Sequence, residues 1–184
     1  MILPIYVYGQ PVLRRVAADV TKDYEGLNQF ITDLWETMYK SDGVGLAAPQ
    51  VGKSIRIFVI DGSPLEEDDP RVKDFKKTFI NARIIERLGE DSVFTEGCLS
   101  IPNIREEVIR PSRVRIQYYD EAWQYHDEFY EGVAARIIQH EYDHLEGIMF
   151  VDHLSAIRKS LLKSKLTAIS KGKVDTAYKI KALK

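Results

Sequence analysis

Hydrophobic residues recur at helical spacing in two stretches of the chain. In residues 24–40, apolar side chains stand three, four, seven and eleven positions after the first: Leu27, Phe30, Ile31, Leu34 and Met38. This stripe predicts a helix with one face against a core, and Ser41-Asp42-Gly43 gives a stop signal. Residues 132–146 carry apolar positions followed by polar ones at the same spacing, which predicts a second helix.

The middle of the chain has short runs rich in β-branched residues, which are typical of strands. We predict strands at residues 55–60, 78–88, 113–119 and 124–130, and a surface loop in the acidic, proline-containing stretch 61–74. Strands in the middle with helices at either end favour an α+β fold with antiparallel sheets over a βαβ fold. No repeat or boundary interrupts the pattern, so we expect one domain over residues 1–184.

The second predicted helix carries the motif Gln139-His140-Glu141-Tyr142-Asp143-His144. At about 100° per residue, His140 and His144 lie about 40° apart, one turn along the same face. Their imidazoles can therefore bind one metal ion, with Glu141 beside it to move the protons of a bound water. The plain alternative is a helix with two histidines on a solvated face.

A catalytic metal site needs a third protein ligand and an open position. The residues downstream offer none: position 150 is Phe150, and no Glu follows Glu146. The third ligand is therefore expected upstream, and Cys98 is a candidate because a thiolate binds borderline metals well. A lone cysteine is nevertheless more often a small buried hydrophobic residue, and His126 and His153 are rival ligands.

A glycine-rich stretch, residues 43–52, separates the first predicted helix from the first strand. Its three glycines and small side chains let a backbone pass close to another group. The plain alternative is a tight loop before a strand. No helix pattern follows it, so we do not expect a phosphate-binding loop. Gln50 is its one amide side chain.

Composition and charge add limits on partners and location. The 184 residues are 45% hydrophobic and 29% charged, which is ordinary for a globular protein. No apolar run approaches the roughly 20 residues that span a bilayer, the start lacks the basic region of a signal peptide, and one cysteine forms no intrachain disulfide. We expect a cytoplasmic protein with no membrane or specific DNA partner.

The C-terminal end is strongly basic, although the net charge is only −2. Residues 158–184 hold nine Lys or Arg and one Asp. We predict an amphipathic helix over residues 154–169, with Ile157, Leu161 and Leu162 opposite its basic side chains. A solvated helix and tail, or a contact with RNA or an acidic surface, explains such a run.

Three motifs occur in a fixed order and together resemble those of bacterial peptide deformylases: Gly43-Val44-Gly45-Leu46-Ala47-Ala48-Pro49-Gln50, Glu96-Gly97-Cys98-Leu99-Ser100 and Gln139-His140-Glu141-Tyr142-Asp143-His144. The resemblance implies antiparallel sheets packed around the motif helix, with helices near both ends. It implies a metal-dependent hydrolase that removes the formyl group from the N-terminal formyl-methionine of newly synthesised polypeptides and releases formate. It also implies Fe²⁺, which Ni²⁺, Co²⁺ or Zn²⁺ replaces in some members.

The same resemblance assigns roles to individual residues. Cys98, His140 and His144 would be the metal ligands and Glu141 the general acid and base. Gln50 and the backbone N–H of Leu99 would hold the developing oxyanion. The expected substrate-binding residues are Val44, Phe94, Val133 and Ile137 for the methionine, Gly45, Gly97 and Ile101 along the peptide, and Arg105 farther out. By family analogy the basic end docks on ribosomal RNA, and deleting residues 170–184 is expected to spare activity on small peptides.

Two other classes of protein share parts of this pattern. A zinc endopeptidase would have the motif helix, but Phe150 stands where an extended protease motif has its third histidine. A non-catalytic metal-binding or RNA-contacting protein would explain the basic end. In that protein, however, Glu141 beside an open metal position has no role.

Overall fold

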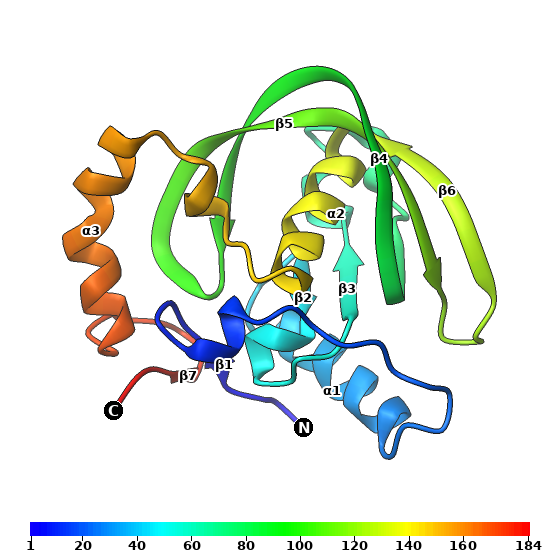
Figure 1. Cartoon of the computed structure of the whole chain (residues 1–184), viewed down its shortest axis with the longest axis horizontal. Coiled ribbons are helices and arrows are strands. Elements are labelled where there is room, and N and C mark those ends of the chain that lie inside the picture. Colours follow the sequence, from blue (N-terminus) through cyan, green and yellow to red (C-terminus); the bar gives the residue numbers. More distant parts are fainter.

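The motif-bearing helix α2 (Gly132–Leu145) lies inside a curved antiparallel sheet in the computed structural model, which describes residues 1–184 (Figure 1). Every residue of α2 after Gly132 is buried. A helix surrounded in this way must satisfy its polar side chains with protein partners. The polar side chains of the motif are therefore expected to be fixed by hydrogen bonds from the surrounding protein.

The sheet has five strands in the order β2-β3-β4-β5-β6, and every neighbouring pair is antiparallel. The strands are β2 (Gly45–Ala47), β3 (Ile57–Asp61), β4 (Lys76–Cys98), β5 (Ile101–Tyr119) and β6 (Tyr125–Glu131). This architecture confirms the expected α+β fold. Leu99 and Ser100 connect the two longest strands, so Cys98 stands at the tip of a hairpin.

Strands β4 and β5 are much longer than the sequence predicted, and they arch over α2 in Figure 1. No residue from 85 to 95 is buried, so the hydrophobic alternation that marks a half-buried strand is missing there. The ladder also shifts register between Leu88 and Asp91, next to Gly89 at φ +78°. A prediction based on alternation therefore stopped at residue 88.

Strand β3 separates two parts of the core because its side chains alternate between the faces of the sheet. Phe58 and Ile60 pack in the hydrophobic cluster around α2. Ile57 and Val59 pack on the other side against helix α1 (Leu27–Lys40). The whole predicted stripe of α1 is buried, and the helix begins at Leu27, after Gly26 at φ +73°.

The glycine-rich stretch does more than form a loop. Residues 45–47 make the buried edge strand β2, paired with β3, and the 3-10 helix η2 (Ala48–Val51) follows at once. The other 3-10 helices are η1 (Pro11–Arg14), η3 (Ser63–Leu65), η4 (Pro70–Val72) and η5 (Phe150–His153). The alternative of a plain tight loop is excluded, because the small residues form a strand that lies against α2.

The start of α2 is held from outside the helix. Its flanking residue Glu131 makes no side-chain cap, and Gly132 takes φ +63°, which favours glycine. The carboxylate of Asp69 accepts the backbone N–H of Val133 at 3.2 Å. Because free N–H groups and the helix dipole both attract negative charge, Asp69 stabilises this end.

The C-terminal part forms helix α3 (Ala156–Ser170) and then a strand. The buried side chains of α3 are Leu162, Leu166 and Ile169, whereas Ile157 and Leu161 are 74% and 63% exposed. Of the predicted apolar face, only Leu162 is therefore confirmed.

Beyond α3 the tail, residues 171–184, folds back onto the beginning of the chain. Strand β7 (Ile180–Lys181) pairs in parallel with β1 (Ile5–Tyr6), in a small second sheet that the expectation of antiparallel sheets did not include. Figure 1 shows these two strands side by side near the marked ends of the chain. No helix of the structure combines the length and the apolar character needed to cross a membrane.

Candidate metal centre

Cys98, His140 and His144 converge in the structure. One ligand atom from each lies within 4.8 Å of the other two. The histidines come from successive turns of α2, and the cysteine comes from the end of β4. The rival histidines lie elsewhere: His126 bonds Asp120 at 2.7 Å, and His153 bonds Asp143 at 2.8 Å.

The surroundings of these three residues fit a bound metal ion. A thiol and two imidazoles suit borderline transition metals. Burial lowers the pKa of His144 to about 3, which keeps its imidazole in the neutral form that binds metal. Nδ1 of His140 lies 2.7 Å from Oε1 of Glu96, so the other ring nitrogen is free for the ion, an arrangement common among metal-binding histidines.

A buried network of charges holds Glu96. Arg110 donates to both of its carboxylate oxygens, at 2.7 and 3.0 Å, and Arg136 donates to one of them at 2.8 Å. Arg110 also donates to Asp143 at 2.8 Å. Although burial acts in the opposite direction, the hydrogen bonds from His140 and Arg110 hold the pKa of Glu96 well below its usual range. The carboxylate therefore stays ionised and fixes the orientation of His140.

Glu141 lies in the pocket against the edge strand. Its Oε2 is buried and has no hydrogen-bond partner, and burial raises the pKa of the carboxyl group to about 7. A Cβ atom on Gly45 would stand 2.6 Å from Oε1 of Glu141. Glycine at position 45 therefore makes room for the carboxylate.

Hydrogen bonds fix the side-chain amide of Gln50 in one orientation. Its Oε1 accepts the backbone N–H of Ala47 at 2.9 Å. This bond leaves the amide NH₂ to face Ser100 Oγ at 3.1 Å and Cys98 Sγ at 3.4 Å. A hydrogen-bond donor is thus held beside the candidate ligand thiol.

A pocket of about 540 Å³ opens in front of this cluster. Twelve residues predicted from the sequence line it: Val44, Gly45, Gln50, Phe94, Gly97, Cys98, Leu99, Ile101, Arg105, Ile137, His140 and Glu141. His144 is 1% exposed and lies behind this lining. Val133 is buried in the same cluster as Ile137 but is not among the lining residues. Its expected contact with the methionine stays a prediction.

Several lining residues were missed by the sequence analysis, among them Leu65, Arg136, Asn103 and the tail residues Asp175, Thr176, Ala177 and Tyr178. Leu65 belongs to the stretch expected to be a surface loop, and no local pattern connects the tail with residues 98–105. Burial raises the pKa of Tyr178 to about 12, so its hydroxyl stays protonated and donates to the carbonyl of Leu99 at 2.8 Å. The tail is thus part of the pocket and not a separate extension.

Comparisons with known proteins agree with this geometry. Residues 2–160 match the family model described as "Polypeptide deformylase". The chain is 52% identical to the peptide deformylase of Christiangramia forsetii, over 98% of this chain and 96% of the relative. It is 51% identical to that of Cytophaga hutchinsonii, over 98% and 97% respectively.

Solved structures give the same result. A peptide deformylase from Plasmodium falciparum superimposes with a TM-score of 0.81 at 36% identity, covering 91% of this chain and 95% of that one. The Thermotoga maritima peptide deformylase has a TM-score of 0.75 at 43% identity, covering 84% and 99%. The sequence match and the structural match, both extending over most of the chain, show that this protein belongs to the polypeptide deformylase family.

Proposed function

We propose that this protein is a metal-dependent hydrolase that removes the formyl group from the N-terminal formyl-methionine of newly synthesised polypeptides and releases formate. The observation that carries the proposal is the convergence of Cys98, His140 and His144 beside Glu141 in one pocket. The family match and the relatives named peptide deformylase support the reaction type.

Cys98, His140 and His144 would hold the metal ion. We propose Fe²⁺, with Ni²⁺, Co²⁺ or Zn²⁺ able to replace it, since a thiolate and two imidazoles accept all of these borderline ions. When bound, the ion would polarise the formyl carbonyl and lower the pKa of a water molecule in the site. The ionised Glu96 would hold His140 in its binding orientation.

Glu141 would carry the protons of the reaction. Its carboxylate would take a proton from the attacking water and return it to the nitrogen of methionine as the formyl–nitrogen bond breaks. Support comes from its place in the pocket and from the buried Oε2, which no protein group satisfies. An unsatisfied buried carboxylate oxygen is unfavourable for stability, so a functional reason for it is expected.

Gln50 and the backbone N–H of Leu99 would stabilise the negative charge on the formyl oxygen. The carbon becomes tetrahedral during attack, and donors held in advance of that step lower the barrier. Gln50 meets this requirement because its hydrogen bond with Ala47 fixes the direction of the NH₂ group. Leu99 follows the candidate ligand Cys98 directly and lines the same pocket.

The pocket would bind the methionine and the start of the peptide. Val44, Phe94 and Ile137 line it and pack against the core around α2, which makes this end apolar. Gly45, Gly97 and Ile101 would follow the peptide backbone, and Arg105 would lie farther out.

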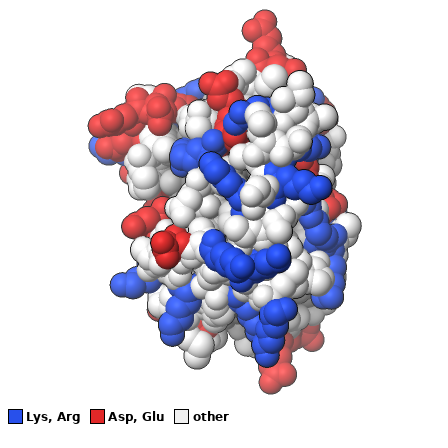
Figure 2. Space-filling model, turned by 90° about the vertical axis from the view of Figure 1, so that its left-hand side faces the viewer, with Lys and Arg blue, Asp and Glu red and all other residues white.

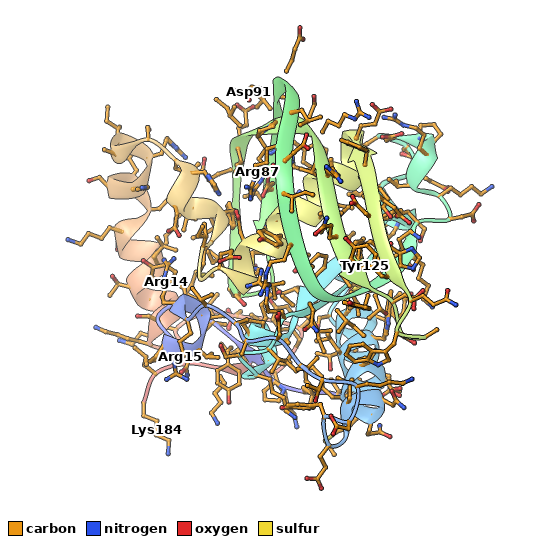
Figure 3. All side chains as sticks on the ribbon, turned by 45° about the vertical axis from the view of Figure 1, so that its right-hand side comes forward. Arg14, Arg15, Arg87, Asp91, Tyr125 and Lys184 are labelled. Atoms are coloured by element: carbon orange, nitrogen blue, oxygen red, sulfur yellow. The ribbon has the colours of Figure 1, made fainter.

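We further propose that the protein works in the cytoplasm as one domain and that the face around α3 contacts ribosomal RNA. Figure 2 shows Lys and Arg side chains gathered over this face. Arg158, Lys159, Lys163 and Lys165 of α3 are all exposed. Figure 3 places Arg14, Arg15 and Lys184 on the same side of the molecule. Positive charge of this kind favours contact with phosphates.

The test of the main reaction is release of formate from N-formyl-Met-Ala-Ser, with N-acetyl-Met-Ala-Ser as the matched substrate. We expect rapid deformylation and far slower deacetylation, because the close packing of Gly45 against Glu141 leaves little room for the methyl of an acetyl group. Equal rates on the two peptides, or no formate, would contradict the proposed function.

A further inference from the structure

The tail lines the active-site pocket from a part of the chain that lies far from all other lining residues. Asp175, Thr176, Ala177 and Tyr178 form this part of the wall, and every other lining residue lies between Asp42 and Glu141. The family model ends at residue 160, so the tail is outside the stretch that defines the family match. The inference below rests on the proposed function.

Hydrogen bonds attach the tail to the rest of the pocket on both sides of Ala177. The hydroxyl of Tyr178 donates to the carbonyl of Leu99 at 2.8 Å, and Nδ2 of Asn103 donates to the carbonyl of Asp175 at 3.0 Å. Both partners belong to the hairpin formed by β4 and β5: Leu99 lies at its tip and Asn103 on β5. The tail therefore has a fixed place beside the residues that follow the candidate ligand Cys98.

Strand pairing and apolar packing hold the tail at its two ends. The N–H of Ile5 donates to the carbonyl of Lys179 at 2.9 Å, and that of Val7 donates to Lys181 at 3.1 Å. Val174 and Ile180, which flank the lining residues, pack against the hydrophobic cluster that contains Leu162 and Leu166. This segment is a built wall and not a loose end.

The position of the wall indicates which part of a peptide it would meet. Val44, Phe94 and Ile137 pack on the core around α2, whereas Leu99 and Tyr178 pack against a different cluster. The apolar end proposed for the methionine and the tail thus lie on separate sides of the pocket. Asp175 and Ala177 are exposed, so they are free to touch a ligand.

We propose that residues 175–178 form a substrate-binding wall for the peptide residues that follow formyl-methionine. The ligand class is the second and third residues of an unfolded polypeptide, contacted mainly through their backbone. Small and polar side chains at 175–177 suit this role, because they leave space for a peptide chain and do not select one side chain by shape.

The test places a large side chain on the wall in the metal-loaded, full-length protein. We expect Ala177→Trp to raise KM for N-formyl-Met-Ala-Ser about tenfold by obstructing the peptide, with kcat nearly unchanged. KM for N-formyl-methionine amide, which ends before the wall, is expected to stay at the wild-type value. Lys179→Trp is the matched control, because Lys179 is exposed on the same tail but does not line the pocket.

Binding of the product peptide Met-Ala-Ser, measured by calorimetry, separates this inference from the proposed function. If the wild-type protein binds the peptide but releases no formate, the proposed deformylation is refuted. The wall is then still tested by comparing the Kd of Met-Ala-Ser between wild type and Ala177→Trp. Unchanged KM and Kd in Ala177→Trp would overturn the proposed role of residues 175–178. An equal rise in KM for formyl-methionine amide would overturn it too. If Ala177→Trp does not fold, Asp175→Trp gives the same comparison at a second exposed lining position.

Discussion

At the scale of single residues, the site combines groups that are fully satisfied with groups that are not. Glu96 has three protein partners, Arg110, Arg136 and His140. Oε2 of Glu141 and Nδ1 of His144, both buried, have none. Leaving a buried polar atom unpaired typically costs about 1–3 kcal/mol. The unpaired atoms of Glu141 and His144 therefore lie next to a fully hydrogen-bonded network around Glu96, which stabilises this part of the structure.

Replacing the cysteine tests the ligand set. Cys98→Ala is expected to lose most of the bound metal, because no other Cys, His, Asp or Glu belongs to the cluster. Elemental analysis of the purified protein measures this, and Gln50→Ala, which removes a neighbour that is not a ligand, should keep its metal. Full occupancy in Cys98→Ala would identify another residue as the third ligand.

Replacing the carboxylate separates binding from chemistry. Glu141→Gln should keep its metal but lower kcat by about 10²–10⁴, the usual contribution of proton transfer by a positioned side chain. Formate release and metal content are measured on the same preparation. A variant with wild-type kcat would refute the role proposed for Glu141.

The glycine beside this carboxylate gives a third prediction. In Gly45→Ala the new Cβ would lie 2.6 Å from Oε1 of Glu141, so the side chain must move. We expect kcat to fall by at least about tenfold, because proton transfer depends on hydrogen-bond reach, while bound metal remains unchanged. A crystal structure of the variant with Glu141 in its original place, together with wild-type kcat, would contradict this explanation.

The two candidate histidine ligands were predictable from the sequence because their geometry is local. His140 and His144 are one helical turn apart, so their spacing alone brings the imidazoles together. The contacts of Glu96 with Arg110 and Arg136 depend on how strands cross a helix, and no short-range pattern contains that information. Cys98 was a candidate because it is the only thiol, whereas the resemblance to deformylases supplied the roles of Gln50 and Leu99. All three residues reach the site only through the fold.

At the scale of secondary-structure elements, the sequence predicted those whose apolar residues form a periodic face or a continuous run. Helix α1 and the inner parts of β4 and β5 follow that rule. The outer part of β4 does not, because none of its residues from 85 to 95 is buried. Edge strand β2 was missed because a stretch of small residues has no alternation to detect.

The capping of α2 by Asp69 gives a pH-dependent prediction. Hydrogen bonds from Arg71, helped by that from Val133, lower the pKa of Asp69 to about 2 in the folded protein from an ordinary value of 3.8. A group with a lowered pKa stabilises the fold above its ordinary pKa and loses this effect as the pH falls through the folded value. Asp69→Asn should therefore be less stable than wild type by about 1 kcal/mol at neutral pH.

The difference between the two proteins should shrink as the pH falls from about 4 to about 2, where Asp69 becomes protonated in both states. Chemical unfolding of the metal-free proteins measures it without interference from ligand protonation. Asp68→Asn is the matched control, because Asp68 is exposed and its side chain makes no hydrogen bond. A constant difference across this pH range would contradict the charge-based explanation.

At the scale of the whole molecule, the tail belongs both to the basic C-terminal end and to the wall of the pocket. The sequence analysis expected residues 170–184 to be dispensable for small peptides, but four of them line the pocket. Deleting the tail would therefore change substrate binding and any contact with RNA at the same time, so the two effects could not be separated. The basic face is better tested on α3, whose exposed charges do not line the pocket.

The paired substitutions Lys159→Glu and Lys163→Glu test the proposed contact with the ribosome. We expect the double variant to lose cosedimentation with ribosomes at low salt, because binding to phosphates depends on positive charge and weakens with salt. Its deformylation of N-formyl-Met-Ala-Ser should match wild type. Lys40→Glu, on α1, is the control for a change of surface charge, and no cosedimentation of the wild-type protein would refute the proposal.

The pairing of β1 with β7 has a consequence for the order in which the enzyme assembles. Ile5 contacts Ile180 across nearly the whole chain, and closing so long a loop is entropically unfavourable until the rest has folded. Cys98, His140 and His144 lie much closer together in sequence, so the metal centre can form first. The tail, held by a ladder only two residues long on each strand, would dock late and detach at a lower free energy than α2. One wall of the pocket could then open and close while the metal centre behind it stays folded.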